Sequence, residues 1–380
     1  MKLLHFADCH LDSPFSGISS AEADVRRAEL CESFVLAIEL AKERNVDIIL
    51  ISGDVFDRPF CTASTKSAVF EALAAAGRPV VISPGNHDPY VKGCAYADKT
   101  LPENVFVFSS EELGRFDFDE LGVSVFGYAF TSGSYDRDPL ADGVPLSETN
   151  INILCAHSDM RSGFSKYAPM TPSEISQAGF VYAALGHVHN PPAPQHIGSC
   201  TVAYSGFLQG RSFDELGEGG AYIVDIDRET LSVSTERVTL SKLRYEIARL
   251  DITGCDRDTE VISKIAKLTA DKGWGENTAL RVILEGSVPS AYSPSQKRIC
   301  GDGATSSLAL LEIKDETAPL LDLEYLQKDM TVRGEFYRLL KGQLTSDDPA
   351  ERECAKLALR AGLAALDRRE LSLGITTDGE

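Results

Sequence analysis

The chain lacks paired cysteines and long apolar runs, and each absence excludes one class of protein. Its nine cysteines are scattered singly, and no two of them form a CxxC pair. This distribution excludes a disulfide framework and predicts reduced thiols in a cytoplasmic protein. No apolar run is long enough to span a bilayer, so no association with a membrane is expected. The opening residues are interrupted by His5 and Asp8, which is too early for a signal peptide.

Basic side chains are also scarce. The 37 Lys and Arg residues face 57 Asp and Glu residues, which gives a net charge of −20. Residues 1–240 hold 17 basic and 33 acidic side chains, so most of the excess negative charge lies there. Acidity of this kind opposes non-specific binding to a polyanion, which depends on Lys and Arg. If the substrate is a nucleic acid, a local basic strip or a partner protein must supply the attraction.

The length and the secondary-structure pattern predict more than one domain, with an α/β core. At 380 residues the chain is too long for one ordinary core. Short apolar runs that alternate with helical patterns predict a largely parallel α/β sheet, and strand-like runs over 104–128 and 196–240 predict a second sheet layer. The strands expected in the first part are 2–8, 46–52, 79–83 and 151–156, and a helix is expected over 62–76. Another helix is expected between the first two strands, with an apolar face made of Val25, Ala28, Cys31, Phe34, Val35, Ile38 and Ala41.

The C-terminal region has a pattern of its own. Residues 1–240 form the predicted core domain, 245–315 a small α+β unit, and 316–380 a helical segment. Within the small unit, the polar stretch 286–307 is predicted to be a loop. In the last segment, Asp348-Pro349 predicts the start of a helix whose apolar face consists of Cys354, Leu357, Ala358, Ala361 and Ala365.

Five blocks of polar side chains carry the functional prediction. Each block places oxygen or imidazole ligands at the end of an apolar run, where α/β proteins bind their ligands. In chain order the blocks are Asp8-Cys9-His10, Gly53-Asp54-Val55-Phe56-Asp57, Gly85-Asn86-His87-Asp88, His157, and Gly186-His187-Val188-His189. The two remaining histidines, His5 and His196, are interpreted as structural.

The spacing within these blocks predicts a binuclear metal centre. A strand alternates its side chains, so Asp8 and His10 are expected to point the same way, and so are His187 and His189. Asp54 can lend one carboxylate oxygen to each of two cations. The predicted ligands are Asp8, His10 and His189 for one metal, Asn86, His157 and His187 for the other, and Asp54 as a bridge between them.

The ligand types indicate the metal and the reaction class. Nitrogen and oxygen ligands without thiolate favour manganese, iron or zinc. Two such cations about 3.5–4 Å apart activate water and stabilise an in-line displacement, which predicts a phosphoester hydrolase. His87 holds no metal in this scheme and is the candidate to donate a proton to the leaving oxygen, with Asp88 orienting its ring. Asp57 is expected to hold the Asp54 loop rather than a metal.

Four basic side chains lie on or near the segments that carry these ligands. Each is a candidate for a contact with substrate phosphate, and an ordinary solvated charge is at least as good an interpretation of each. They are Arg58, Arg161, Lys166 and Arg211.

The set of motifs resembles the calcineurin-like metallophosphoesterase superfamily over residues 1–225. Within that superfamily, residues 4–15 look like the SbcD-type DNA repair nucleases, closest to the YhaO-like branch, and residues 206–213 and 217–220 are similar to the same branch. The resemblance implies an α/β fold, with a two-sheet α/β sandwich core and a smaller C-terminal α+β cap with helices. It also implies a manganese-dependent DNA exonuclease and single-strand endonuclease, homodimerisation, and a partner ATPase of the SbcC type with a long coiled coil.

Two other functions stay open at this point. A small-molecule phosphodiesterase or a protein phosphatase would use the same binuclear site, and the acidity of the chain favours that alternative. A non-enzymatic role would leave the metal site vestigial and use the C-terminal helices to dock a partner. The complete ligand set argues against a vestigial site, because buried carboxylates and imidazoles without metal are costly.

Overall fold

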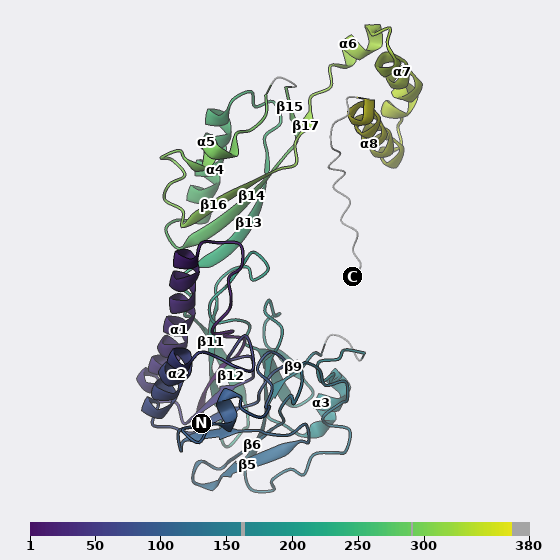
Figure 1. Cartoon of the computed structure of the whole chain (residues 1–380). Helices are drawn as coiled ribbons and strands as arrows, with labels where there is room; N and C mark the ends of the chain where they lie inside the picture. The colour runs from purple at the N-terminus through teal and green to yellow at the C-terminus, as the bar shows by residue number, and fades with distance from the viewer. Residues whose placement is uncertain (161–163, 290–291, 367–380) are drawn as a thin grey trace. The chain divides into compact units, whose positions relative to one another are not determined.

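The apolar runs of the first part of the chain pair into two six-stranded sheets (Figure 1). The computed structural model describes residues 1–160, 164–289 and 292–366. These residues form two compact units, and the boundary between them falls between Tyr245 and Glu246. The finer division of the second unit into a cap and a helical segment remains a prediction.

The first sheet has parallel strands at its centre. Strands β1 to β4 run parallel to one another, and β11 and β12 extend the sheet as antiparallel strands beyond β1. In the order of the sheet, the strands are β12 (Val233–Thr239), β11 (Gly220–Ile226), β1 (Lys2–Phe6), β2 (Ile48–Ile51), β3 (Val80–Ile82) and β4 (Val105–Val107). The expected parallel α/β arrangement of the first three predicted strands is confirmed.

The second sheet is built in the same way. Its four central strands are parallel, and an antiparallel strand closes each edge. The order is β5 (Gly114–Phe118), β6 (Val123–Gly127), β7 (Ile151–His157), β8 (Tyr182–Gly186), β10 (Cys200–Tyr204) and β9 (Gln195–Ile197). The predicted strand 151–156 therefore belongs to this second layer, not to the sheet that holds the first three.

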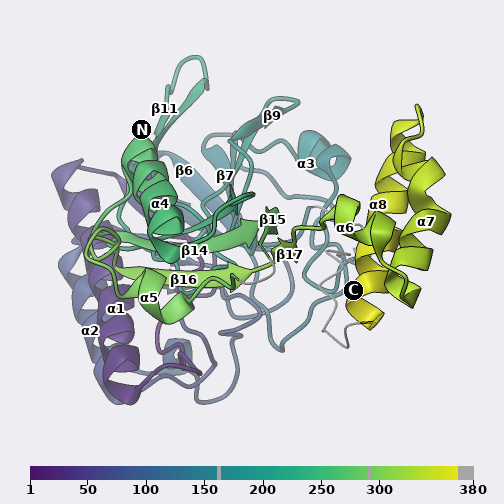
Figure 2. The ribbon, with the colours of Figure 1, turned by 90° about the horizontal axis from the view of Figure 1, so that it is seen from above.

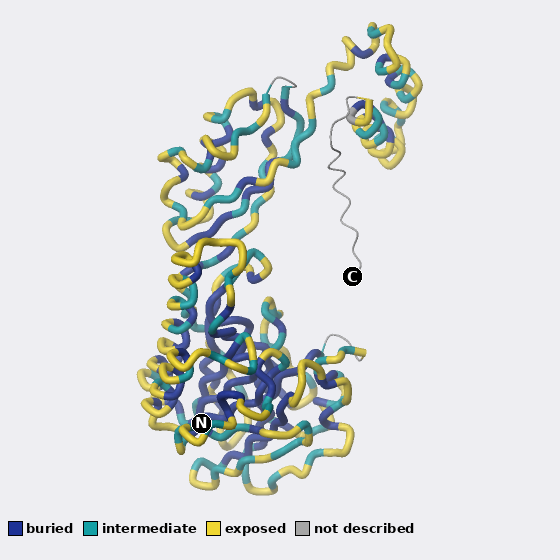
Figure 3. Tube along the Cα trace, viewed as in Figure 1, coloured by how far each residue is buried: buried dark blue, intermediate teal, exposed yellow. Residues whose placement is uncertain are grey.

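Side chains of the two sheets alternate between three apolar layers. Leu3, Leu50 and Val81 point between the sheets, where they meet residues of the second sheet such as Val125 and Tyr182. The alternate residues of the first sheet pack under the helices, and those of the second sheet form the third layer. Because both faces of each central strand are covered, these strands are apolar throughout. Figure 3 shows the buried residues gathered in the middle of this unit.

Helices α1 (Ser20–Glu43) and α2 (Ala63–Ala75) lie side by side against the first sheet (Figures 1 and 2). The Ser19 side chain caps α1, and the Thr62 side chain caps α2, by accepting a hydrogen bond from a backbone N–H of the first turn. The other short helices of this unit are η1 (Ala95–Ala97), η2 (Asp119–Leu121) and α3 (Pro172–Ala178). The predicted helix over 62–76 is confirmed.

The buried face of α1 differs from the predicted one. Phe34, Ile38 and Ala41 are buried as expected, but Val25 and Val35 are 57% and 36% exposed. Their places in the core are taken by Ala23, Leu30, Ala37 and Leu40. Both sets fit a helical repeat, because the helix carries apolar side chains on more than one face, and contact with the sheet decides which face is buried.

In the second unit, three strands form a sheet in the order β13 (Arg244–Asp251), β14 (Thr278–Glu285) and β16 (Leu310–Asp315). Helices α4 (Asp258–Lys272) and α5 (Gln296–Cys300) pack against this sheet (Figure 2). The predicted loop over 286–307 is wrong in part, because α5 lies within it. The same stretch contains the short strand β15 (Ser287–Val288), which pairs with β17 (Ala318–Pro319).

Three helices follow: α6 (Leu323–Lys328), α7 (Val332–Leu344) and α8 (Pro349–Leu366). Helix α8 begins where Asp348-Pro349 predicted, but its packed face was predicted wrongly. Ala355, Leu359 and Leu363 are buried at a spacing of four residues, whereas Cys354 and Leu357 are exposed. Among the described residues, no helix combines the length and the apolar content needed to cross a bilayer.

His5 is a titratable side chain in the layer between the two sheets. Its Nδ1 atom lies 2.8 Å from the hydroxyl oxygen of Tyr182, and its ring stacks against Tyr222. Burial, with a smaller contribution from the nearby Arg237 charge, lowers the pKa of His5 to about 3. The unfolded chain therefore binds a proton at His5 more readily than the folded chain. The stability that depends on neutral His5 is complete above the ordinary pKa of 6.5 and falls as the pH drops from there towards 3.

We expect the stability of a His5→Gln variant to fall less than that of the wild type as the pH is lowered. Between pH 7 and pH 5, protonation of His5 in the unfolded state should cost the wild-type chain about 2 kcal/mol that the variant does not lose. Urea denaturation at both pH values measures the difference, with His196→Gln as the control, because His196 is exposed. Equal losses in wild type and His5→Gln would contradict the assignment.

Candidate metal centre

The five polar blocks meet at one edge of the two sheets. Asp8, Asp54 and Asn86 lie in the loops that follow β1, β2 and β3, His157 is the last residue of β7, and the fifth block follows β8. These are the carboxyl ends of parallel strands from both layers, which brings together residues far apart in the sequence.

The backbone at these positions differs from the extended strands that the sequence suggested. Asp8, His10, Asp54 and His187 have φ angles of 51°, 43°, 51° and 103°, a left-handed region that non-glycine residues rarely adopt. Strand alternation is therefore not the reason that Asp8 and His10 face the same site. The loops bend sharply, and such strained positions persist only where surrounding contacts hold them.

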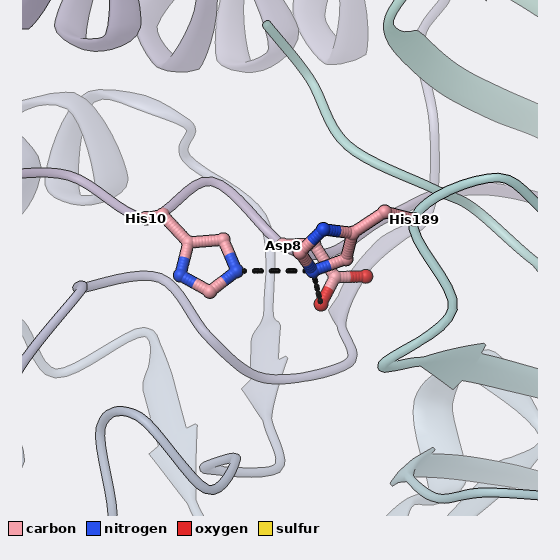
Figure 4. Close-up of side chains that lie close together, drawn as sticks. All are labelled: Asp8, His10 and His189. Carbon is pink, nitrogen blue, oxygen red and sulfur yellow. Dashed lines mark hydrogen bonds and ion pairs between the residues drawn. The ribbon is translucent and has the colours of Figure 1, made fainter. Parts of the chain in front are cut away.

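Asp8, His10 and His189, here called the Asp8 group, converge as predicted (Figure 4). The Nε2 atoms of His10 and His189 lie 3.2 Å apart. The Nε2 atom of His189 lies 3.7 Å from Oδ1 of Asp8. The three donor atoms all lie within 4.8 Å of one another, so they can hold one cation.

Asn86, His157 and His187 are here called the Asn86 group, and donor atoms of His157, Asp54 and Asp8 lie within 4.8 Å of one another. The Nε2 atom of His157 is 3.0 Å from Oδ1 of Asn86, and the ring of His187 lies 5.2 Å from the His157 ring between centroids. Oδ2 of Asp54 is 3.7 Å from Nε2 of His10 and 3.4 Å from Nε2 of His157. The Asp54 carboxylate thus faces both groups, as a bridging ligand must.

The charge of the site fits bound cations. Asp8 and Asp54 are 1% and 2% exposed, and two buried carboxylates this close require positive charge for compensation. Burial alone would raise the pKa of Asp54, but His157 and His10 lower it to about 2. Burial also raises the pKa of the Cys9 thiol well above its usual value, and among the described residues Cys9 belongs to none of the clusters that could hold a metal ion. The donor set is therefore nitrogen and oxygen, which suits manganese, iron or zinc.

His87 stands at the rim of the site and is exposed. Its backbone N–H donates to Oδ1 of Asp54 at 3.0 Å, and its Nδ1 atom lies 3.3 Å from the carbonyl oxygen of Asp57. A ring nitrogen of His87 also lies within 4.8 Å of donor atoms of His10 and Asp54, so distance alone does not separate it from the metal ligands. Its exposure to solvent distinguishes it from the buried His10 and favours the predicted role in proton transfer.

Asp88 takes the role that was expected of Asp57, and Asp57 has a different one. Asp88 accepts hydrogen bonds from the backbone N–H groups of Gly85, Asp54, Val55 and Phe56 and from the Tyr96 hydroxyl. It therefore holds the Asp54 loop and does not orient the His87 ring. The Asp57 carboxylate instead lies 3.4 Å from Nδ1 of His10. The sequence did not reveal these contacts, because they depend on how the loops bend.

A second layer of contacts fixes the histidine rings. Nδ1 of His157 lies 2.9 Å from the Ser52 carbonyl oxygen, which leaves its Nε2 atom to face Asp54 and Asn86. Nδ1 of His189 lies 2.9 Å from Oε1 of Glu215. Burial alone would raise the pKa of Glu215, but His189 and Arg211 lower it to about 2. Sequence reasoning missed Glu215, because it belongs to none of the five blocks and no pattern links it to His189.

The structure describes three of the four basic side chains that could contact a substrate phosphate. Arg211 pairs with Glu215 and Asp57, so its charge is already compensated. Arg58 and Lys166 are exposed, and a phosphate contact for either remains a prediction. Arg161 lies outside the described residues.

A cavity of about 450 Å³ opens over the site. Its wall includes the Tyr167 ring, whose centroid is 4.7 Å from that of His187. The Nζ atom of Lys166 lies 5.7 Å from the centroid of the Tyr167 ring. The remaining lining residues are Asp54, Asn86, His87, Val188, His189 and Asn190. The cavity gives access to the proposed bridge and to the proposed proton donor.

This fold and this donor set define a phosphoesterase, and comparison with protein families agrees. Residues 1–191 match the calcineurin-like phosphoesterase family, and the chain belongs to that family. One relative, from Bacillus subtilis, has the name "Uncharacterized metallophosphoesterase YhaO". It is 28% identical over 306 residues, which cover 76% of this chain and 72% of that one. The DNA double-strand break repair protein Mre11 of Methanopyrus kandleri is 23% identical over 376 residues, which cover 91% of this chain and 80% of that one. A dimetal phosphatase from Danio rerio superposes with a TM-score of 0.42 at 10% identity, over 63% of this chain and 96% of that one.

We expect an Asp88→Asn variant to bind manganese roughly 10–100-fold more weakly, the usual effect of losing a partner that orients a metal ligand. An amide cannot accept the set of N–H groups that fixes the Asp54 loop. Calorimetric titration with Mn²⁺ measures the change. Asp227→Asn is the matched control, because Asp227 also accepts backbone N–H groups but lies in the β11–β12 turn. Unchanged metal affinity together with lost turnover would instead indicate that Asp88 orients the His87 ring.

Proposed function

We propose that this chain is a metal-dependent phosphodiester hydrolase that acts on DNA, as an exonuclease and endonuclease subunit in DNA repair. The observation that carries the proposal is the convergence of the Asp8 group, His157 and Asn86 around Asp54, below an open cavity. The similarity to an Mre11 protein favours DNA as the substrate. The proposed ligands are Asp8, His10, Asp54, Asn86, His157, His187 and His189.

At such a site, two divalent cations supply the activation of water and the neutralisation of charge on phosphoryl oxygens. We propose manganese as the metal. The chain's own residues perform the other tasks. The Asp54 carboxylate holds the two positions together, and the outer contacts of His10, His157 and His189 keep each Nε2 atom directed inwards. His87, at the rim, donates a proton to the leaving oxygen.

A partner and a cellular location complete the proposal. The segment from α6 to α8 carries exposed apolar side chains, among them Tyr325, Met330, Val332 and Leu339. We propose that they bind a coiled-coil ATPase of the SbcC type, which would also supply the basic surface that this acidic chain has little of. A homodimer and a cytoplasmic location belong to the same proposal.

The second candidate function is a small-molecule phosphodiesterase or a protein phosphatase with the same metal site. The net charge of −20 favours it, because an acidic chain attracts DNA poorly. The Tyr167 ring on the cavity wall favours a substrate with a nucleobase, such as DNA, over a phosphoprotein, because a base can stack on an aromatic side chain there.

We expect Asp54→Ala and His189→Ala to abolish Mn²⁺-dependent degradation of DNA, because each removes a ligand of the site. His87→Ala should still bind two Mn²⁺ ions but lose roughly 10²–10⁴-fold in turnover, the usual contribution of a general acid. Gel assays on single-stranded and duplex DNA measure turnover, and calorimetry measures metal content. Wild-type protein that binds two Mn²⁺ ions and leaves every DNA end and single strand uncut would contradict the proposal.

A Tyr167→Leu variant separates the two candidate functions. If a base stacks on Tyr167, the KM for single-stranded DNA should rise roughly tenfold, and activity on a small phosphodiester such as bis-p-nitrophenyl phosphate should change much less. Phe60→Leu is the matched control, because Phe60 is an exposed aromatic residue outside the cavity lining. Equal effects on both substrates, or far faster turnover of cyclic nucleotides or phosphopeptides than of DNA, would favour the second candidate.

A further inference from the structure

Arg211 is a partly buried charge beside the metal centre that the proposed chemistry does not use. Its side chain is 20% exposed and lies between two carboxylates. One guanidinium nitrogen is 3.0 Å from Oδ1 of Asp57, and Nε is 3.0 Å from Oε1 of Glu215. The Arg211 backbone N–H also donates to Glu215, at 2.7 Å. Arg211 therefore fixes both carboxylates, and it is not one of the residues that line the cavity.

Each of these carboxylates faces a histidine of the Asp8 group. Asp57 lies 3.4 Å from Nδ1 of His10, and Glu215 lies 2.9 Å from Nδ1 of His189. A further contact runs from Arg211 to the Ser13 hydroxyl, which donates to the His10 carbonyl oxygen at 2.8 Å. One guanidinium thus connects the supports of both imidazoles whose Nε2 atoms lie 3.2 Å apart.

In the Asn86 group, His157 has a different support. Its Nδ1 atom faces the neutral carbonyl oxygen of Ser52. A carboxylate behind an imidazole makes the ring a stronger electron donor than a carbonyl does, and it fixes the ring orientation. Carboxylates therefore support His10 and His189, whereas a neutral oxygen supports His157.

We infer that Arg211, Asp57 and Glu215 form a positioning clamp that strengthens metal binding by the Asp8 group. The inference rests on the proposed function, because it presupposes that the two groups bind metal. Arg211 acts through the two carboxylates and contacts no substrate. It also offsets part of their negative charge, which would be costly in a partly buried setting without a cation.

The test is a Mn²⁺ titration of the full chain by calorimetry, with electron paramagnetic resonance as a second readout. Wild type should fill two positions. Arg211→Gln should weaken one of them by roughly 10–100-fold and leave the other within about threefold. The resonance signal of a coupled manganese pair should then appear only at higher Mn²⁺ concentration. Arg211→Lys, which keeps the charge but not the fork of donors, should recover part of the affinity.

Arg44→Gln is the matched control, because Arg44 forms a two-point ion pair with Glu236 in the same unit, with nitrogen–oxygen distances of 3.1 and 2.6 Å. It should bind Mn²⁺ as wild type does. If Arg211→Gln does not fold, as judged by circular dichroism, Glu215→Gln tests the same clamp with a smaller change. A folded Arg211→Gln or Glu215→Gln variant with two wild-type affinities, or with equal weakening of both positions, overturns the inference. Wild-type protein that binds fewer than two Mn²⁺ ions overturns the proposed function instead.

Discussion

The geometry of the site depends on the hydrogen bonds that the buried Asp88 carboxylate accepts from the loops after β2 and β3. Backbone N–H groups of Gly85 and of residues 54–56 all point at this carboxylate. They hold Asp54 in a left-handed backbone conformation, with its side chain between His10 and His157. Gly85 allows the two loops to approach so closely, because a Cβ atom there would lie 2.9 Å from the Asp54 carboxyl carbon. Asp54 can act as a bridge only while this arrangement holds.

Outside the proposed ligands, the supports of three histidine rings differ in charge. Charged groups, Asp57 and Glu215, stand behind the Asp8 group, and a backbone carbonyl stands behind His157. The acidity of the chain and the partial burial of Arg211 leave few basic groups for the substrate. The proposed partner would then have to attract a polyanion, while the cavity would select the substrate by its shape and by base stacking.

The sequence predicted the strands of the core and the residues that converge, but not the contacts that orient them. Strands such as β1, β2 and β7 are apolar throughout because both faces are covered, so they were visible in the sequence. The polar blocks were visible because each one stands at the end of such an apolar run. The roles of Asp57 and Asp88 depend on left-handed turns that no residue pattern announces, and Glu215 meets His189 only through the fold. The buried faces of α1 and α8 were misjudged, because apolar side chains occur on more than one face of each helix.

The most direct test of a binuclear centre shared through Asp54 is anomalous X-ray diffraction from crystals grown with Mn²⁺. We expect two anomalous peaks per chain, one on each side of the Asp54 carboxylate. One peak should be in contact with Asp8, His10 and His189, and the other with Asn86, His157 and His187. A single peak, or two peaks that do not share Asp54, would contradict the structure proposed for this site.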